Sequence, residues 1–120
     1  MLGLGILRGH RLALATEDQF TPLYIGKSMP LWGLEVIGPL RVGAELTSHL
    51  ESDTPPTLAL ISVNLPGLDE AIDRLLAGRK VPYLVFGAPM SVSALNNTTR
   101  MLSPFTAFQI ADELARLLAR

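Results

Sequence analysis

An uninterrupted apolar segment at residues 58–61 most constrains the fold of this 120-residue chain. It has no polar alternation before Ser62, which is typical of a strand that is buried on both faces of a parallel sheet. A loop-like segment, Val63-Asn64-Leu65-Pro66-Gly67, follows the strand, and a helical pattern comes next. Because ligands of such sheets bind at the carboxyl ends of the strands, Ser62 and Asn64 lie where a functional site is expected.

Other short apolar runs of strand length lie on both sides of this segment. They are bounded by turn residues, as the strands of a buried sheet usually are. The predicted strands are 12–15, 35–38, 58–61, 83–86 and 99–102.

Helical patterns alternate with these strands. The predicted helices are 42–51, 68–78 and one that opens with a capping box at Thr106, whereas any helix within 91–98 is short. The segment 19–32 is expected to form a poor helix. Pro22 is tolerated in a first turn, but Pro30 ends the helix early and leaves a connecting turn.

This alternation of strands and helices argues for an α/β fold. Right-handed crossovers leave few topologies for such a chain. The predicted fold class is therefore α/β, a flavodoxin-like, doubly wound sheet of five parallel strands in the order 2-1-3-4-5 with helices on both faces. A single domain is expected over residues 11–120, and residues 1–10 are expected to form a loose N-terminal leader.

Composition limits the kind of partner. Apolar residues make up 48% of the chain and charged residues 18%, with a formal net charge of -1. This balance provides no field that would attract nucleic acid or an anionic membrane, so neither is an expected partner. The absence of cysteine excludes disulfides, thiolate chemistry and cysteine-based zinc sites. No export signal is visible in the first residues, so the expected location is the cytoplasm.

The order and spacing of several segments resemble the receiver domain of bacterial response regulators, from Arg11 to Arg120. One of them, 61–67, is similar to the family's phosphoacceptor segment, in which an Asp stands one residue before Val-Asn-Leu-Pro. The other matching segments are 11–15, 35–39, 43–46, 81–87 and 102–105. The resemblance implies a module of two-component, or phosphorelay, signal transduction.

Residue by residue, the resemblance implies a degenerate phosphoryl-binding pocket. Ser62 stands at the phosphoacceptor position, and a neutral hydroxyl cannot form the acyl phosphate that a carboxylate forms. Thr16 and Glu17 stand at the two acidic positions that hold Mg²⁺ in the family. A hard cation finds few charged ligands there, so no cofactor is expected and Mg²⁺ binding is not predicted. Glu17 and Asp18 could at most keep a weak cation site.

Three further positions depart from the family's pattern. Gly87 stands where the family has a hydroxyl residue at the end of the fourth strand. Ser103 replaces the Lys before Pro-Phe, and Arg100 stands at the aromatic switch position. Together with Asn64, these residues complete a pocket of the pseudo-receiver type, which lacks the phosphoacceptor Asp.

The departures predict a signalling module that acts by protein–protein interaction, independently of phosphorylation. Its expected partners are signalling proteins, and a homodimer through residues 91–120 is a further hypothesis, because this face often mediates dimers in receivers. The alternative is a small-ligand sensor that uses the strand-end crevice around Ser62, with Thr16, Asn64 and Ser103 as hydrogen-bonding groups.

An enzyme of this fold is a third hypothesis, for which the sequence offers no catalytic residues. A catalytic serine needs a positioned base and an oxyanion site. His10, in the expected leader, and His49, late in the helix at 42–51, are predicted to lie away from the strand ends, so no enzymatic activity is predicted. One apolar patch is either core or part of a partner surface: Tyr24, Met29, Leu31 and Trp32.

Overall fold

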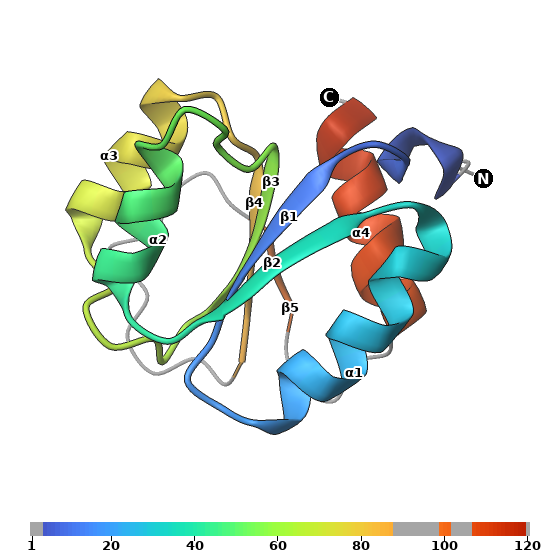
Figure 1. Cartoon of the computed structure of the whole chain (residues 1–120), viewed down its shortest axis with the longest axis horizontal. Helices are drawn as coiled ribbons and strands as arrows, with labels where there is room; N and C mark the ends of the chain where they lie inside the picture. Colours follow the sequence, from blue (N-terminus) through green and yellow to red (C-terminus); the bar gives the residue numbers. More distant parts are fainter. Residues whose placement is uncertain (1–3, 88–98, 102–106, 120) are drawn as a thin grey trace.

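The computed structural model describes residues 4–87, 99–101 and 107–119. Within these ranges five strands pair in parallel, in the order β2-β1-β3-β4-β5 (Figure 1). The strands are β1 (Arg11–Ala15), β2 (Glu35–Leu40), β3 (Leu58–Ser62), β4 (Tyr83–Phe86) and β5 (Thr99–Met101). The predicted parallel α/β sheet is confirmed, and the first four strands lie in the predicted order.

Helices cover both faces of the sheet. In Figure 1, α1 and α4 lie on one face, and α2 and α3 lie on the other. The helices are α1 (Phe20–Ser28), α2 (Gly43–Leu50), α3 (Glu70–Gly78) and α4 (Ala107–Ala119), with short 3-10 helices η1 (Leu4–Leu7) and η2 (Met29–Trp32). The predicted helices at 42–51 and 68–78 are confirmed within two residues at each end, which is the usual uncertainty of helix boundaries.

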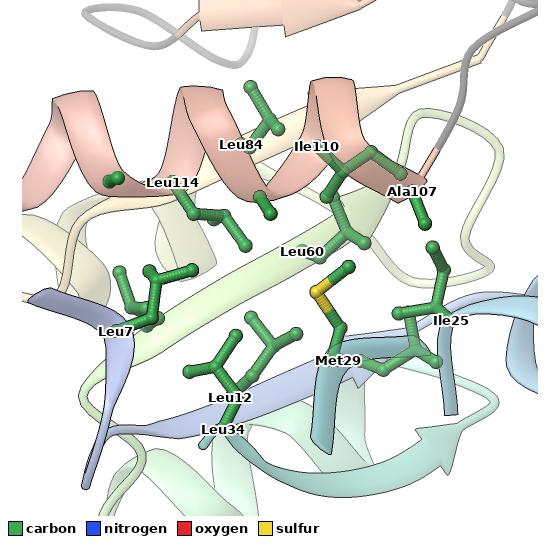
Figure 2. Packing of buried hydrophobic residues seen from close by; sticks show 14 of the residues in the cluster. Leu7, Leu12, Ile25, Met29, Leu34, Leu60, Leu84, Ala107, Ile110 and Leu114 are labelled. Carbon is green, nitrogen blue, oxygen red and sulfur yellow. The ribbon is translucent and has the colours of Figure 1, made fainter. Parts of the chain in front are cut away.

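The central strands β1 and β3 are buried on both faces, which explains their continuous apolar sequences. Successive side chains of a strand point to opposite faces. Leu58 and Leu60 therefore join the apolar cluster under α1 and α4, whereas Ala59 and Ile61 join the cluster under α2 and α3. Figure 2 shows the first of these clusters, with Leu60 between the strands and α4. Each fully buried leucine contributes about 1.5–3 kcal/mol relative to an exposed one.

The prediction of a loose leader is wrong for residues 4–10. Leu4–Leu7 form the 3-10 helix η1, and the Leu7 side chain is fully buried in the cluster under α1 and α4 (Figure 2). The Gly9 N–H donates to the Gly33 carbonyl at 3.1 Å, which ties the segment to the turn after η2. The burial of Leu7 fixes this segment in place. The sequence does not predict it, because four residues are too few to show a helical or strand pattern.

The segment at 19–32 forms a regular helix and then a tighter one. Helix α1 runs over nine residues, with Pro22 in its first turn as predicted. Pro30 stands near the start of η2, and Gly33 ends η2 in the left-handed region at φ 85°. The predicted connecting turn is thus a 3-10 helix, because Pro30 has no N–H to continue an α-helical ladder.

Strand β2 is longer than predicted. It continues through the cis Gly38–Pro39 bond to Leu40, which is buried. A proline is tolerated here because β2 is an edge strand and needs no donor on its outer side.

Two of the predicted features lie outside the described residues: the short helix within 91–98 and the capping residue Thr106. Among the helices that are described, none is both long enough and apolar enough to cross a membrane.

Candidate functional site

The carboxyl ends of β1, β3 and β4 bring together the residues that we call the strand-end site: Thr16, Glu17, Asp18, Ser62 and Gly87. They meet because the three strands are parallel neighbours, with β3 in the middle. Thr16 is fully buried and Ser62 is 3% exposed. Thr16 and Ser62 thus lie at the carboxyl ends of neighbouring strands, at the same edge of the sheet.

The Ser62 hydroxyl is engaged in a local turn. Its oxygen accepts a hydrogen bond from the Asn64 N–H at 3.2 Å, and the Ser62 carbonyl accepts from the Leu65 N–H at 3.1 Å. The Asn64 side chain is exposed, whereas Leu65 is buried. Ser62 thus shapes the loop after β3. Among the described residues, no histidine or carboxylate hydrogen-bonds to its hydroxyl as a base would.

Gly87 has a backbone that disfavours the hydroxyl residue of the receiver pattern. Its φ is +117°, a conformation that side chains with a Cβ rarely adopt. A Cβ built at this position would also lie 3.0 Å from the Val63 Cγ1 atom. The position after β4 is therefore fitted to glycine, and Thr or Ser here would strain the chain.

Asp18 is the carboxylate that the site actually holds in place. Its side chain accepts from the Thr16 hydroxyl at 2.5 Å, from the Thr21 hydroxyl at 2.7 Å and from the Thr21 N–H at 3.0 Å. Burial raises the pKa of Asp18, but the hydrogen bonds from Thr16 and Thr21 outweigh burial and lower the pKa below its ordinary value. Asp18 thus acts as a cap for the start of α1.

The capping role of Asp18 is not predicted by the sequence analysis, which gives Asp18 and Glu17 only as a possible weak cation site. The available signal was the Asp-x-x-Thr spacing from Asp18 to Thr21, because a capping carboxylate reaches an N–H about three residues ahead. Glu17, by contrast, is exposed. The described residues include no group of three His, Cys, Asp or Glu side chains that could hold a metal ion.

Arg41 adds a positive charge that sequence reasoning also missed. Its guanidinium donates to the carbonyl oxygen of Thr16 at 3.4 Å and to that of Asp18. Its own N–H donates to the Glu45 carboxylate at 2.8 Å, which fixes the backbone where α2 begins. Arg41 follows β2, so its approach to the β1 loop depends on tertiary structure.

Two further predicted site residues, Arg100 and Ser103, lie partly or wholly outside the described residues. Arg100 lies on β5, where its backbone is opposite Val85, but its side chain is outside the description. Ser103 also lies outside the described residues, as does most of the proposed dimer region 91–120 apart from β5 and α4.

The apolar patch predicted around α1 is divided between core and surface. Met29 is buried, and Tyr24 and Trp32 pack against the core. Three side chains are strongly exposed, and we call them the α1 surface: Phe20 at 73%, Leu23 at 64% and Leu31 at 79%. Phe20 and Leu23 were not predicted, because the prolines obscured which side of this helix faces solvent.

Comparison with solved structures shows that the chain has the fold of response regulator receiver domains. A response regulator receiver protein from Sinorhizobium medicae WSM419 matches with a TM-score of 0.79 and 17% identity, covering 92% of this chain and 94% of that one. The signal receiver domain of a signal transduction histidine kinase from Syntrophus aciditrophicus gives a TM-score of 0.75 and 18% identity, covering 92% and 91%. A CheY-like receiver domain from Methanospirillum hungatei JF-1 gives 0.76 and 13%, covering 92% and 94%.

At the level of sequence, no protein-family model and no curated protein matches the chain. The flavodoxin-like receiver fold, expected from the spacing of the segments, is thus confirmed by three-dimensional similarity at low identity.

Proposed function

We propose that the protein is a receiver-fold signalling module that acts by protein–protein interaction and does not accept a phosphoryl group. One observation carries this proposal: the residue at the end of the central strand is a buried serine whose hydroxyl is held by the Asn64 N–H. A serine hydroxyl at this position is neither a carboxylate nor an activated nucleophile.

The electrostatics of the strand-end site support the same conclusion. Mg²⁺ beside a phosphoryl group is usually held by one or two carboxylates together with phosphate oxygens and waters. Here the Asp18 carboxylate accepts three hydrogen bonds, and using it for a cation would uncap α1. Glu17 remains as an exposed carboxylate next to it. A site with so little negative charge is poorly suited to hold Mg²⁺.

The α1 surface supports interaction with another protein. It exposes Phe20 and Leu23 in the first turn of α1, a helix where Lys27 is the single charged residue, and Leu31 on the following helix η2. Their relative exposures are 64–79%. Exposed apolar side chains grouped in this way mark interaction surfaces more often than scattered ones do. The structural neighbours named as receiver domains suggest that the partner is a signalling protein.

The small-ligand sensor remains the alternative use of the strand-end site. A ligand would have to reach the hydroxyl of a residue that is only 3% exposed and displace its hydrogen bond from the Asn64 N–H. This cost makes the protein–protein interaction the better supported function.

The experiment is quantitative capture of partners by the immobilised protein from an extract of its native host. The captured signalling protein should be retained equally with and without acetyl phosphate and Mg²⁺. Leu23→Asp should reduce its retention by about ten-fold or more, because a charge would be placed in an apolar contact. Leu23 is mostly exposed, so the variant should keep its fold.

Ala44→Asp serves as the matched control. Ala44 is exposed in the first turn of α2, on the opposite face of the sheet, where a negative charge is tolerated. This variant should retain the partner. Retention that depends on acetyl phosphate, or that is the same for Leu23→Asp and the wild type, would contradict the proposal.

A further inference from the structure

A cleft lies at the edge of the sheet opposite the strand-end site. It has a volume of about 540 Å³ and is formed where β1, β3 and β4 begin and where α3 and α4 end. These strand starts and helix ends lie at the upper edge of the ribbon in Figure 1. We call it the cationic cleft, and its defining residues are His10, Thr57, Arg79, Lys80, Leu117 and Leu118. Nothing in the proposed signalling function uses it.

The charges of this cleft are segregated. Three of its lining side chains can carry a positive charge, and the described residues that line it include no carboxylate. Another cleft, between α2 and α3, has the opposite character: its lining includes Glu51 and Asp69 and, among the described residues, no basic side chain. The two clefts thus differ in the sign of their charge, although the whole chain is nearly balanced, with ten basic and eleven acidic residues.

The walls of the cleft are held by defined contacts. His10 Nδ1 lies 2.8 Å from the Thr57 hydroxyl, which also accepts from the Arg11 N–H at 2.9 Å. The Arg11 guanidinium donates to the Thr54 carbonyl and pairs with Glu35 at 3.0 Å. The polar wall is therefore preorganised. Leu117, Leu118 and three prolines supply the apolar part of the lining.

Lys80 is held in an unusual backbone conformation. It is the one non-glycine residue with positive φ, at +57°, in the described part of the chain. The Lys80 N–H donates to the Ala77 carbonyl at 3.1 Å, and the Val81 N–H donates to the Leu76 carbonyl at 2.9 Å. These two bonds form a Schellman motif, in which the left-handed position is usually a glycine.

The glycine of this helix end stands elsewhere, at Gly78, two residues before the left-handed position. A lysine in this position costs stability relative to glycine. Backbone strain of this kind concentrates at functional positions, where the side chain is needed. The strain therefore points to a role for the Lys80 ammonium group.

The positive charges of Arg79 and Lys80 are only partly offset by the negative C-terminal ends of the neighbouring helices. Helices α3 and α4 both end at this edge, and each helix C-terminus carries roughly half a negative elementary charge. The two ends together offset about half of the charge of Arg79 and Lys80. The cleft thus keeps a positive balance even before His10 is considered.

From these observations we propose that the cationic cleft binds a small organic anion, a molecule with a phosphate or carboxylate group attached to an apolar or aromatic body. Arg79 and Lys80 hold the anionic group, and the imidazole of His10 provides a further hydrogen bond to it. The apolar body lies against Leu117 and Leu118. This site rests on the geometry of the cleft and is independent of the proposed function.

The test is a titration of the full chain with phenyl phosphate, followed through the backbone amide NMR signals of Thr57, Val81 and Leu118. We expect saturable shifts with a dissociation constant of about 1 mM or lower, the range expected for a ligand of this size. Inorganic phosphate should bind at least about five-fold more weakly, because it lacks the apolar body. Benzoate shows whether a carboxylate serves as well as a phosphate.

Two variants separate binding from folding. Lys80→Gly should weaken phenyl phosphate binding about five-fold or more while it leaves the melting temperature unchanged or raises it by a few degrees, because glycine relieves the strain. Arg74→Gln is the matched control: it also removes one positive charge, but Arg74 lies within α3, its side chain is 72% exposed, and it pairs with Glu70 outside the cleft. It should bind phenyl phosphate like the wild type.

Three results would overturn the proposal. One is the absence of saturable shifts at the three amides at concentrations far above 1 mM. Another is equal binding by the wild type and Lys80→Gly, which would show that the ammonium group has no part in binding. The third is equal affinity for inorganic phosphate and phenyl phosphate, which would exclude recognition of an apolar body.

Discussion

At the scale of single residues, Asp18 shows how the strand-end site uses its charge. A carboxylate beside β1 could serve a cation or the chain itself, and here it accepts hydrogen bonds from Thr16 and Thr21. These bonds lower the pKa of Asp18 against the opposing effect of burial. The charge therefore stabilises the start of α1.

Removal of this cap should destabilise the protein. Asp18→Ala is expected to lower the free energy of unfolding by about 1–2 kcal/mol at neutral pH, which urea denaturation measures. Because the folded pKa is depressed, the contribution of the charge is present above the unfolded pKa and is lost as the pH falls through the folded pKa. The difference between the wild type and the variant should shrink accordingly in acid.

Glu17→Ala is the neighbouring control for this prediction. Glu17 is exposed, and an exposed substitution usually changes stability by less than about 0.5 kcal/mol. Equal effects of the two substitutions, or a gap that widens in acid, would argue against Asp18 as the cap.

At the scale of elements, η1 is held in place by the burial of one side chain. Its local sequence has no pattern that predicts a helix. Of its described side chains, Leu7 is fully buried and contacts the cluster under α4, whereas Ile6 is 40% exposed. A single buried residue within four gives no helical or strand period. By contrast, β3 is buried at all five positions and was predictable for that reason.

This difference yields a matched pair of substitutions. Leu7→Ala should lower the free energy of unfolding by about 2–5 kcal/mol, because it removes buried methyl groups and leaves a cavity. Ile6→Ala deletes a similar volume from a partly exposed side chain and should cost less than about 1 kcal/mol. The midpoints of urea denaturation of the two variants measure this difference in stability. Similar midpoints would mean that η1 adds nothing to the core and that the segment is a loose leader after all.

At the scale of the whole molecule, the parallel sheet and the gathering of Thr16 and Ser62 at one edge could be predicted from the sequence, because strand alternation fixes topology and topology fixes strand ends. The contacts of Arg41 and the left-handed backbone conformation of Lys80 could not be predicted from the sequence. The contacts of Arg41 with the β1 loop depend on the packing of two loops that are distant in sequence. The left-handed Lys80 follows from the path between α3 and β4, where the sequence signal pointed to Gly78.

The two edges of the sheet also differ in charge and in the way they are built. At one edge the carboxyl ends of the strands hold a buried serine and a capping carboxylate, and at the other the helix ends frame a cationic cleft. We therefore expect no phosphoryl chemistry at the edge where the resemblance to receiver domains would place it, and we propose an independent anion site at the opposite edge.

The most direct test of the absence of phosphoryl binding is an amide NMR titration with Mg²⁺ and beryllofluoride, a mimic of a bound phosphoryl group. The signals of Glu17, Ser62 and Gly87 report on the strand-end site, and those of Val81 and Leu118 report on the cationic cleft. At matched ionic strength, we expect no saturable shift at Glu17, Ser62 and Gly87. Saturable shifts centred on Ser62 that spread along the fold would show that the pocket still recognises a phosphoryl-like ligand and would contradict the account.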